Sequence, residues 1–132
     1  MFKFSYSKDK ISWSYFISKC FTNLCYSKLQ FQPSSIGDVG KMKVTAATAI
    51  LNKHYDQVSV VPVVKSLNEG NALDDLQGVD VIIDATDNIE ARQVIDRASR
   101  ELKIPMVYGG LYRFEGQVAI LNHDGSPGFN EL

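Results

Sequence analysis

The sequence predicts an α/β fold, an open sheet with flanking helices, and two observations support that prediction. From residue 38 onward, helix-forming and strand-forming patterns alternate in the order α, β, α, β, α, β, β. The pattern over 79–84 is a run of apolar and β-branched residues that ends abruptly in polar ones. Such a run predicts a buried strand, and open α/β sheets place their ligand crevice at the carboxyl ends of their strands.

The first elements of this alternation are a helix and a strand. Asp38 is expected to cap a helix of about three turns, because apolar residues recur with helical spacing after it. A β-branched run over 58–64 follows and carries Pro62. Proline cannot donate a hydrogen bond to a neighbouring strand, so this strand is expected at an edge of the sheet.

The later elements surround the buried strand. A short helix is expected near 72–76, just before that strand. Apolar residues over 91–102 keep a period of about 3.6 residues and predict an amphipathic helix after the strand. The expected order is completed by a short strand over 104–108, a turn at Gly109-Gly110 and a final strand over 113–122.

Residues 1–35 follow a different pattern and are expected to form a divergent segment ahead of a domain over 36–132. Apolar and polar residues alternate over 2–7 and again over 11–17. Alternation with a period of two predicts half-buried strands. The segment is therefore expected to contribute two strands joined around residues 8–10.

Composition is that of an ordinary soluble protein. The 132 residues suffice for one domain with a substantial core, and 45% of them are hydrophobic. The net charge of −1 gives no basic excess, so neither a nucleic acid nor an acidic membrane surface is expected as a partner. The aromatic N-terminal segment is interrupted by serines and Lys19, which makes it too polar for a membrane span. We expect a cytoplasmic protein.

The strand over 79–84 ends in side chains that suit two different roles. Asp87 and its polar neighbours lie just before a helix, where a nucleotide or metal site is expected. A second interpretation is open, because Asp87 and Glu90 have the spacing of a capping box, in which both side chains bind backbone amides of the first helical turn. The residues alone favour the cap. The polar group consists of Asp84, Thr86, Asp87 and Asn88.

Three blocks of sequence stand in a specific order and spacing. They are Asp38-Val39-Gly40-Lys41-Met42-Lys43, then Asp84-Ala85-Thr86-Asp87-Asn88 with Arg92, then the stretch from Tyr108 to Gln117. Together these blocks resemble the ThiF/MoeB/HesA family of ubiquitin-activating-type adenylating enzymes. The resemblance covers approximately residues 36–127.

The resemblance implies a Rossmann-like sheet, ATP and Mg²⁺ as cofactors, a homodimer, and adenylation of the C-terminal glycine of a ubiquitin-like sulfur-carrier protein. It implies that Asp87 positions magnesium and that Lys43 meets the ATP phosphates, so these two are the expected catalytic residues. Attack on the α-phosphorus gathers negative charge on phosphate oxygens, which a lysine and a carboxylate-held Mg²⁺ would offset. The other expected nucleotide-binding residues are Asp84, Thr86, Asn88 and Arg92.

The chain departs from the family pattern at both ends. In the family a strand, a Gly-x-Gly-x-x-Gly loop and a helix precede these blocks, whereas residues 1–35 contain no glycine. Backbone amides of such a loop hold phosphates at a helix N-terminus. Many members carry Pro-Cys-x-x-Cys where this chain has Pro127-Gly128-Phe129-Asn130-Glu131, so no zinc is expected. We expect a member truncated at both ends, either an adenylyltransferase or a non-catalytic module that keeps the fold.

Strand order gives one further expectation. A Rossmann-like sheet has the order 3-2-1-4-5-6, so without the family's first two strands the 58–64 strand has no neighbour joining it to the 79–84 strand. Two bare strand edges facing each other would be an aggregation hazard. We expect the alternating segments over 2–7 or 11–17, or a second chain, to fill this gap.

Overall fold

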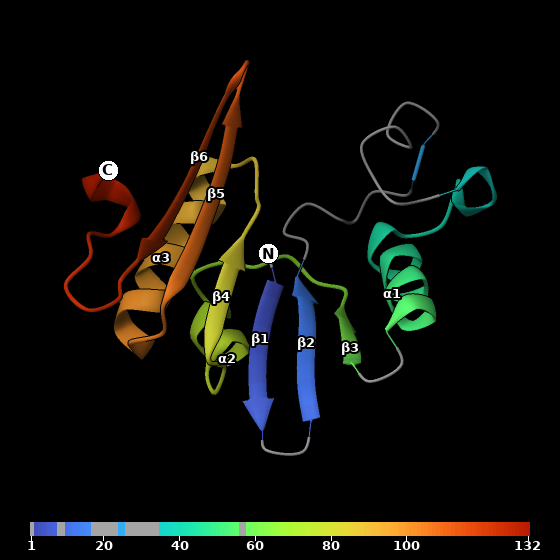
Figure 1. The fold of residues 1–132 in the computed structure, drawn as a ribbon, viewed down its shortest axis with the longest axis horizontal. Coiled ribbons are helices and arrows are strands. Elements are labelled where there is room, and N and C mark those ends of the chain that lie inside the picture. The colour runs from blue at the N-terminus through green and yellow to red at the C-terminus, as the bar shows by residue number, and fades with distance from the viewer. Residues whose placement is uncertain (1, 8–9, 17–23, 26–34, 56–57) are drawn as a thin grey trace.

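The computed structural model describes residues 2–7, 10–16, 24–25, 35–55 and 58–132, and its strands join in a six-stranded sheet (Figure 1). The strands are β1 (Phe2–Ser7), β2 (Lys10–Phe16), β3 (Val58–Val63), β4 (Val81–Asp84), β5 (Met106–Tyr112) and β6 (Glu115–Leu121). Their order in the sheet is β3-β2-β1-β4-β5-β6. This is the order of a Rossmann-like sheet, so the predicted fold class is confirmed.

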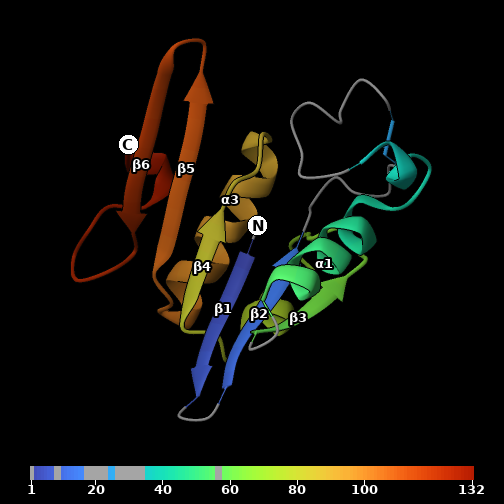
Figure 2. The ribbon, with the colours of Figure 1, turned by 45° about the vertical axis from the view of Figure 1, so that its right-hand side comes forward.

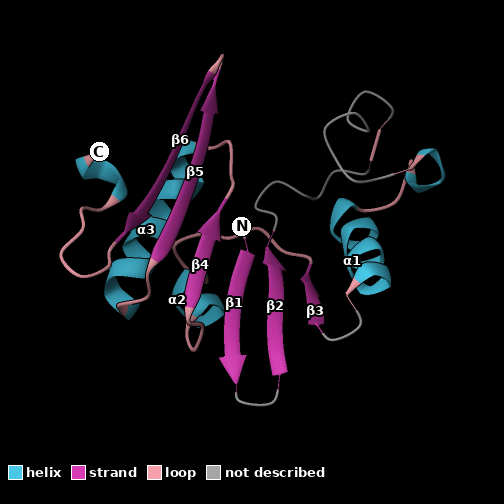
Figure 3. Cartoon of the chain, in the orientation of Figure 1, coloured by secondary structure: helices cyan, strands magenta, loops and turns pink. Residues whose placement is uncertain are grey.

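Helices lie on both faces of this sheet. Figure 2 shows α1 in front of β2 and β3, and α2 and α3 behind the strands. Figure 3 shows β5 and β6 projecting beyond the other strands as a long hairpin. None of the helices in the described ranges is long and apolar enough to cross a membrane. The helices are α1 (Lys43–His54), α2 (Ala72–Leu76) and α3 (Ile89–Leu102), with short 3₁₀ helices η2 (Ile36–Asp38) and η3 (Phe129–Glu131).

The N-terminal segment fills the gap in the sheet, as expected. β1 and β2 form a hairpin between β3 and β4. β1 pairs antiparallel with β4, and β2 pairs parallel with β3. Among the residues that the structure describes, β3 pairs with β2 alone, so the predicted edge position of the proline-containing strand is also confirmed.

The core lies between α2, α3 and the face of β4, β5 and β6 that these helices cover. Ile82 of β4, Met106 of β5 and Leu121 of β6 are completely buried, as are Leu76 of α2 and Ile95 of α3. Side chains alternate across a strand, so Ile82 of β4 enters this core while its neighbours Val81 and Ile83 do not. The helix expected over 91–102 is confirmed as α3, which begins two residues earlier.

The turn expected at Gly109-Gly110 is wrong, because both glycines lie inside β5 and pair with β6. The hairpin turns instead at Arg113, whose φ is 54°. A Cβ on Gly110 would lie 2.3 Å from the hydroxyl oxygen of Tyr108. Gly110 therefore leaves room for the Tyr108 ring, which lies across the same face of the strand.

The expected cap of the first helix is also wrong. α1 begins at Lys43, whereas Asp38 closes the preceding 3₁₀ turn. The Asp38 carboxylate accepts hydrogen bonds from Lys41 Nζ (2.8 Å), Ser35 N (3.0 Å) and Ser35 Oγ (2.8 Å). The Lys41 bond, followed by those from Ser35, holds the pKa of Asp38 well below its ordinary value. Any stabilisation from this turn is therefore present at neutral pH and lost as the pH falls through that low pKa.

Candidate functional site

The loop over 84–88 leaves the carboxyl end of β4 in a tight turn. Asp84 is completely buried, and its Oδ1 accepts a hydrogen bond of 2.9 Å from the backbone N–H of Thr86. Asp84 Oδ2 lies 3.5 Å from Arg92 Nε, in a buried ion pair. The strand end is thus fixed by its own last side chain and by a cation from α3.

Arg92 joins this loop to the β5–β6 hairpin. Its Nε and Nη2 both donate to the carbonyl oxygen of Thr86, the Nε bond being 3.1 Å long. Its Nη1 donates to the Tyr108 hydroxyl at 3.1 Å, and its Nη2 to the Gly109 carbonyl at 3.4 Å. The Arg92 guanidinium carbon also lies 4.8 Å from the centre of the Tyr108 ring, within cation–π range.

Asn88, rather than Asp87, caps α3. Asn88 Oδ1 accepts a hydrogen bond of 3.1 Å from the backbone N–H of Glu90, and the helix begins at Ile89. The prediction that Asp87 caps the helix is therefore wrong. The helix starts one residue later than a capping box of Asp87 and Glu90 requires. Asp87 is exposed, and its carboxylate has no hydrogen bond or ion pair with any residue that the structure describes. That carboxylate is available to a ligand.

A pair of alanine variants separates the two neighbours. Asn88→Ala should lower the free energy of unfolding by about 1 kcal/mol, because it removes the side-chain acceptor at the helix N-terminus. Asp87→Ala should change that free energy by less than about 0.5 kcal/mol, as expected of an exposed side chain without partners. Urea denaturation of the two variants measures both. Equal losses would contradict the assignment of the cap to Asn88.

Lys43 lies on another part of the sheet. It is the first residue of α1, and α1 packs on β3 and β2 rather than on β4. Figure 1 shows the first turn of α1 toward the same edge of the sheet as the carboxyl end of β4, with other strands between them. The structure brings Asp84, Thr86 and Arg92 into contact and leaves Lys43 outside that contact.

Comparison with known proteins assigns the family. The family model described as "ThiF family" matches residues 26–132. The chain belongs to the ThiF family. This confirms the resemblance carried by the three sequence blocks.

Two relatives illustrate what this ThiF-family chain is similar to. It is 38% identical over 88 residues to the SAMP-activating enzyme E1 of Haloferax volcanii, an alignment covering 67% of this chain and 33% of that protein. It is 35% identical over 89 residues to the adenylyltransferase and sulfurtransferase MOCS3 of Aedes aegypti, covering 67% of this chain and 20% of that protein. The chain thus spans a third or less of the length of these relatives.

A solved structure supports the fold. The crystal structure of PaaA superposes with a TM-score of 0.68 at 25% sequence identity, covering 83% of this chain and 37% of that one. The fold shared with PaaA therefore covers more of the chain than the alignments with these two relatives do.

The residues at the end of β4 fit a magnesium ion that is shared with a nucleotide. Mg²⁺ in such sites takes one or two carboxylates, with the substrate's phosphates and water completing its six oxygen ligands. Asp87 offers one exposed carboxylate, and the hydroxyl of Thr86 is buried with no hydrogen-bond partner among the described residues. Within those residues no group of three or more His, Cys, Asp or Glu side chains could hold a metal by itself. The donors suit a shared ion better than a self-contained metal centre.

Sequence reasoning missed two aromatic residues of this site. The ring centres of Tyr108 and Phe129 lie 5.4 Å apart, and the Arg92 guanidinium carbon lies 5.9 Å from the centre of the Phe129 ring. Tyr108 belongs to the third block of the family resemblance, so its position two residues before Gly110 was the available signal. Phe129 comes from the C-terminal segment and gives no local signal.

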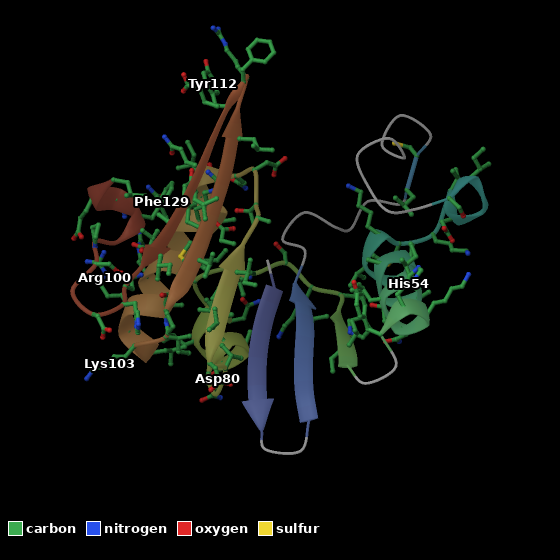
Figure 4. The ribbon with its side chains drawn as sticks, in the orientation of Figure 1. His54, Asp80, Arg100, Lys103, Tyr112 and Phe129 are labelled. Carbon is green, nitrogen blue, oxygen red and sulfur yellow. The ribbon has the colours of Figure 1, made fainter. Side chains whose placement is uncertain are left out.

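A buried carboxylate, Asp96 of α3, holds that C-terminal segment. Asp96 is 1% exposed, and its Oδ1 accepts from Asn122 Nδ2 and from the backbone N–H of Phe129, both at 2.9 Å. Arg100 lies 3.4 Å from both Asp96 Oδ2 and Glu131 Oε1, and Figure 4 shows it between α3 and the C-terminal segment. The segment that carries Phe129 is thereby fixed beside Arg92.

Proposed function

We propose that this chain carries the magnesium side of an ATP-dependent adenylation site that activates the C-terminus of a ubiquitin-like sulfur-carrier protein. Its relatives include enzymes named for this chemistry, among them a sulfur carrier protein adenylyltransferase of Thermus thermophilus, 36% identical over 86 residues. The observation that supports the proposal most directly is the exposed Asp87 carboxylate. Asp87 follows Thr86, whose backbone N–H donates to Asp84 and whose carbonyl oxygen accepts from Arg92.

Each residue would act on charge that develops at the phosphates. Mg²⁺ bound there would neutralise the oxygens around the α-phosphorus and orient the leaving pyrophosphate. Asp87 would hold that ion, and Lys43 would pair with phosphate oxygens. Asp84, being buried and paired with Arg92, would fix the loop that carries Asp87.

Residues 1–35 do not supply the glycine-rich loop whose backbone amides would hold the phosphates, because they contain no glycine. β1 and β2 of this segment occupy the sheet positions from which the family's glycine-rich loop would start. We therefore expect weak nucleotide binding and no ATP–pyrophosphate exchange from the 132-residue chain alone. This absence also favours the second candidate, a non-catalytic module that keeps the fold.

A graft decides between the two candidates. Residues 1–35 are replaced by the strand, glycine-rich loop and helix of an intact relative, and exchange is measured with Mg²⁺-ATP and a carrier protein ending in glycine. The proposal predicts exchange by the grafted chain that disappears when the carrier's terminal glycine is deleted. A folded graft that shows no exchange above a protein-free blank would support the non-catalytic module.

We also propose that the protein forms a homodimer through the uncovered face of the β5–β6 hairpin. Leu111, Val118 and Ile120 share this face, opposite the one covered by α3, and are 93%, 82% and 57% exposed. An uncharged apolar surface of this kind marks an interaction site, and two copies of it would match each other. Sedimentation analysis of the parent and of Val118→Lys tests this, the variant being expected to sediment as a monomer.

The cytoplasmic location stays a prediction.

A further inference from the structure

We propose that Arg92 and Tyr108 are a positioning pair that holds the 84–88 loop, and with it Asp87, at the carboxyl end of β4. The inference rests on the proposed role of Asp87 in holding magnesium. It adds two residues that act on that role through the backbone of Thr86, without contacting the metal or the nucleotide themselves.

The Arg92 guanidinium is already occupied by the protein. Each of its three nitrogens has a hydrogen-bond acceptor, and the side chain is 14% exposed. Turning toward a phosphate would break the bonds to the Thr86 carbonyl and leave Asp84 buried without its cation, which is costly. The geometry therefore favours a fixed Arg92 whose partner is the loop.

Thr86 is the point on which this pair acts. Its backbone N–H donates to Asp84 and its carbonyl oxygen accepts from Arg92. Both backbone polar groups of the residue that precedes Asp87 are therefore fixed. Thr86 itself is 8% exposed. Asp87 is thus an exposed side chain on a backbone that is immobilised immediately before it.

Tyr108 sets the orientation of Arg92. Its hydroxyl oxygen accepts from Arg92 Nη1 at 3.1 Å, and its ring, 6% exposed, lies beside the guanidinium. Gly110 leaves the space that the tyrosine needs, since a Cβ there would lie 2.3 Å from the hydroxyl oxygen and 2.9 Å from Cζ. Phe129 packs against the ring at a centroid distance of 5.4 Å. The hydroxyl has little freedom to leave the guanidinium.

Amide hydrogen exchange of the 132-residue chain, measured by NMR without nucleotide, tests the positioning directly. Tyr108→Phe removes one hydroxyl and should raise the exchange rate of the Thr86 amide about 10-fold, the effect of losing one hydrogen bond that opposes local opening. The amide of Ser99, in the body of α3, should keep its rate. Tyr112→Phe is the matched control, because Tyr112 lies near the tip of the hairpin and is 69% exposed (Figure 4).

Two further variants extend the test to Arg92. Arg92→Lys keeps the charge beside Asp84 but loses the planar fork, so it should raise Thr86 exchange by at least the same factor. Arg97→Lys is its control, since Arg97 is a 63% exposed arginine on the same helix. An unchanged Thr86 rate in both Tyr108→Phe and Arg92→Lys would overturn the inference, whatever the chain's behaviour toward nucleotide.

A second readout distinguishes positioning from general stabilisation. In NMR titrations, Tyr108→Phe should weaken binding of Mg²⁺-ATP about 10-fold while leaving binding of metal-free ATP unchanged, because only the metal-bound form uses Asp87. Equal weakening of both forms would overturn a role directed at Asp87. A parent chain that binds the two forms equally would overturn the proposed function of Asp87, while Thr86 exchange would still decide the positioning.

Discussion

Asp87→Asn should lower ATP–pyrophosphate exchange by the grafted chain at least about 100-fold, the scale on which a single electrostatic group at a reaction centre acts. Asparagine keeps the size of the side chain but has no charge with which to hold Mg²⁺. Stability should not change, because Asn88 supplies the helix cap. Exchange is measured under saturating Mg²⁺-ATP, and the free energy of unfolding of the same variant is measured by urea denaturation.

The matched control for this experiment is Asp74→Asn. Asp74 is an exposed carboxylate in the first turn of α2, so its substitution changes the net charge by the same amount. It should leave exchange within about 2-fold of the parent graft, since exposed charges away from a site are largely screened. Equal activity of the Asp87→Asn and parent grafts would remove Asp87 from the metal site.

The largest stability loss is expected from Asp96→Ala. Asp96 is buried and accepts hydrogen bonds from Asn122 and from the backbone of Phe129. Its removal leaves the Phe129 N–H without this acceptor and Arg100 without its buried carboxylate partner. Losses of this kind amount to about 3 kcal/mol. Chemical denaturation with urea should show this decrease. Protection of the 126–132 amides from exchange should fall with it.

Glu101→Ala is the control on the same helix, because Glu101 is exposed and is expected to change stability by less than about 0.5 kcal/mol. An Asp96→Ala variant as stable as Glu101→Ala would show that the C-terminal segment is held by other contacts.

A separate check uses Gly128, where a Cβ would lie 2.0 Å from Arg100 Nη2. Gly128→Ala should displace Arg100 from Asp96 and destabilise the chain less than Asp96→Ala.

Strands and helices with a clear period were predictable from sequence. The apolar run of β4, the 3.6-residue repeat of α3 and the proline in β3 each gave a pattern that depends on a few adjacent residues. The position of the N-terminal hairpin was predictable for another reason. A sheet does not tolerate two facing bare edges, and the alternating segments were the available strands.

Errors arose where several neighbouring residues could play the same part. Asp87 and Asn88 are both good capping residues, and sequence alone does not decide which one begins α3. The pair Gly109-Gly110 is typical of a turn in sequence, whereas in the structure Gly110 leaves space for the Tyr108 ring. Asp38 resembles a helix cap and closes a separate 3₁₀ turn.

Most of the candidate site depends on contacts between distant parts of the chain. Arg92 and Tyr108 are separated by 16 residues, and Asp96 and Phe129 by 33. No local period reports such contacts. The family resemblance indicated Arg92 and Asp84 as members of the site, and the structure adds that they contact each other and Thr86.

Anomalous diffraction from crystals of the grafted chain, grown with ATP and Mn²⁺ in place of Mg²⁺, tests the central claim most directly. We predict a manganese peak within about 2.2 Å of an Asp87 carboxylate oxygen and in contact with phosphate oxygens of the nucleotide. Thr86 and Arg92 should keep their contact in the same crystals. A manganese ion bound to the phosphates but out of reach of Asp87 would contradict the account.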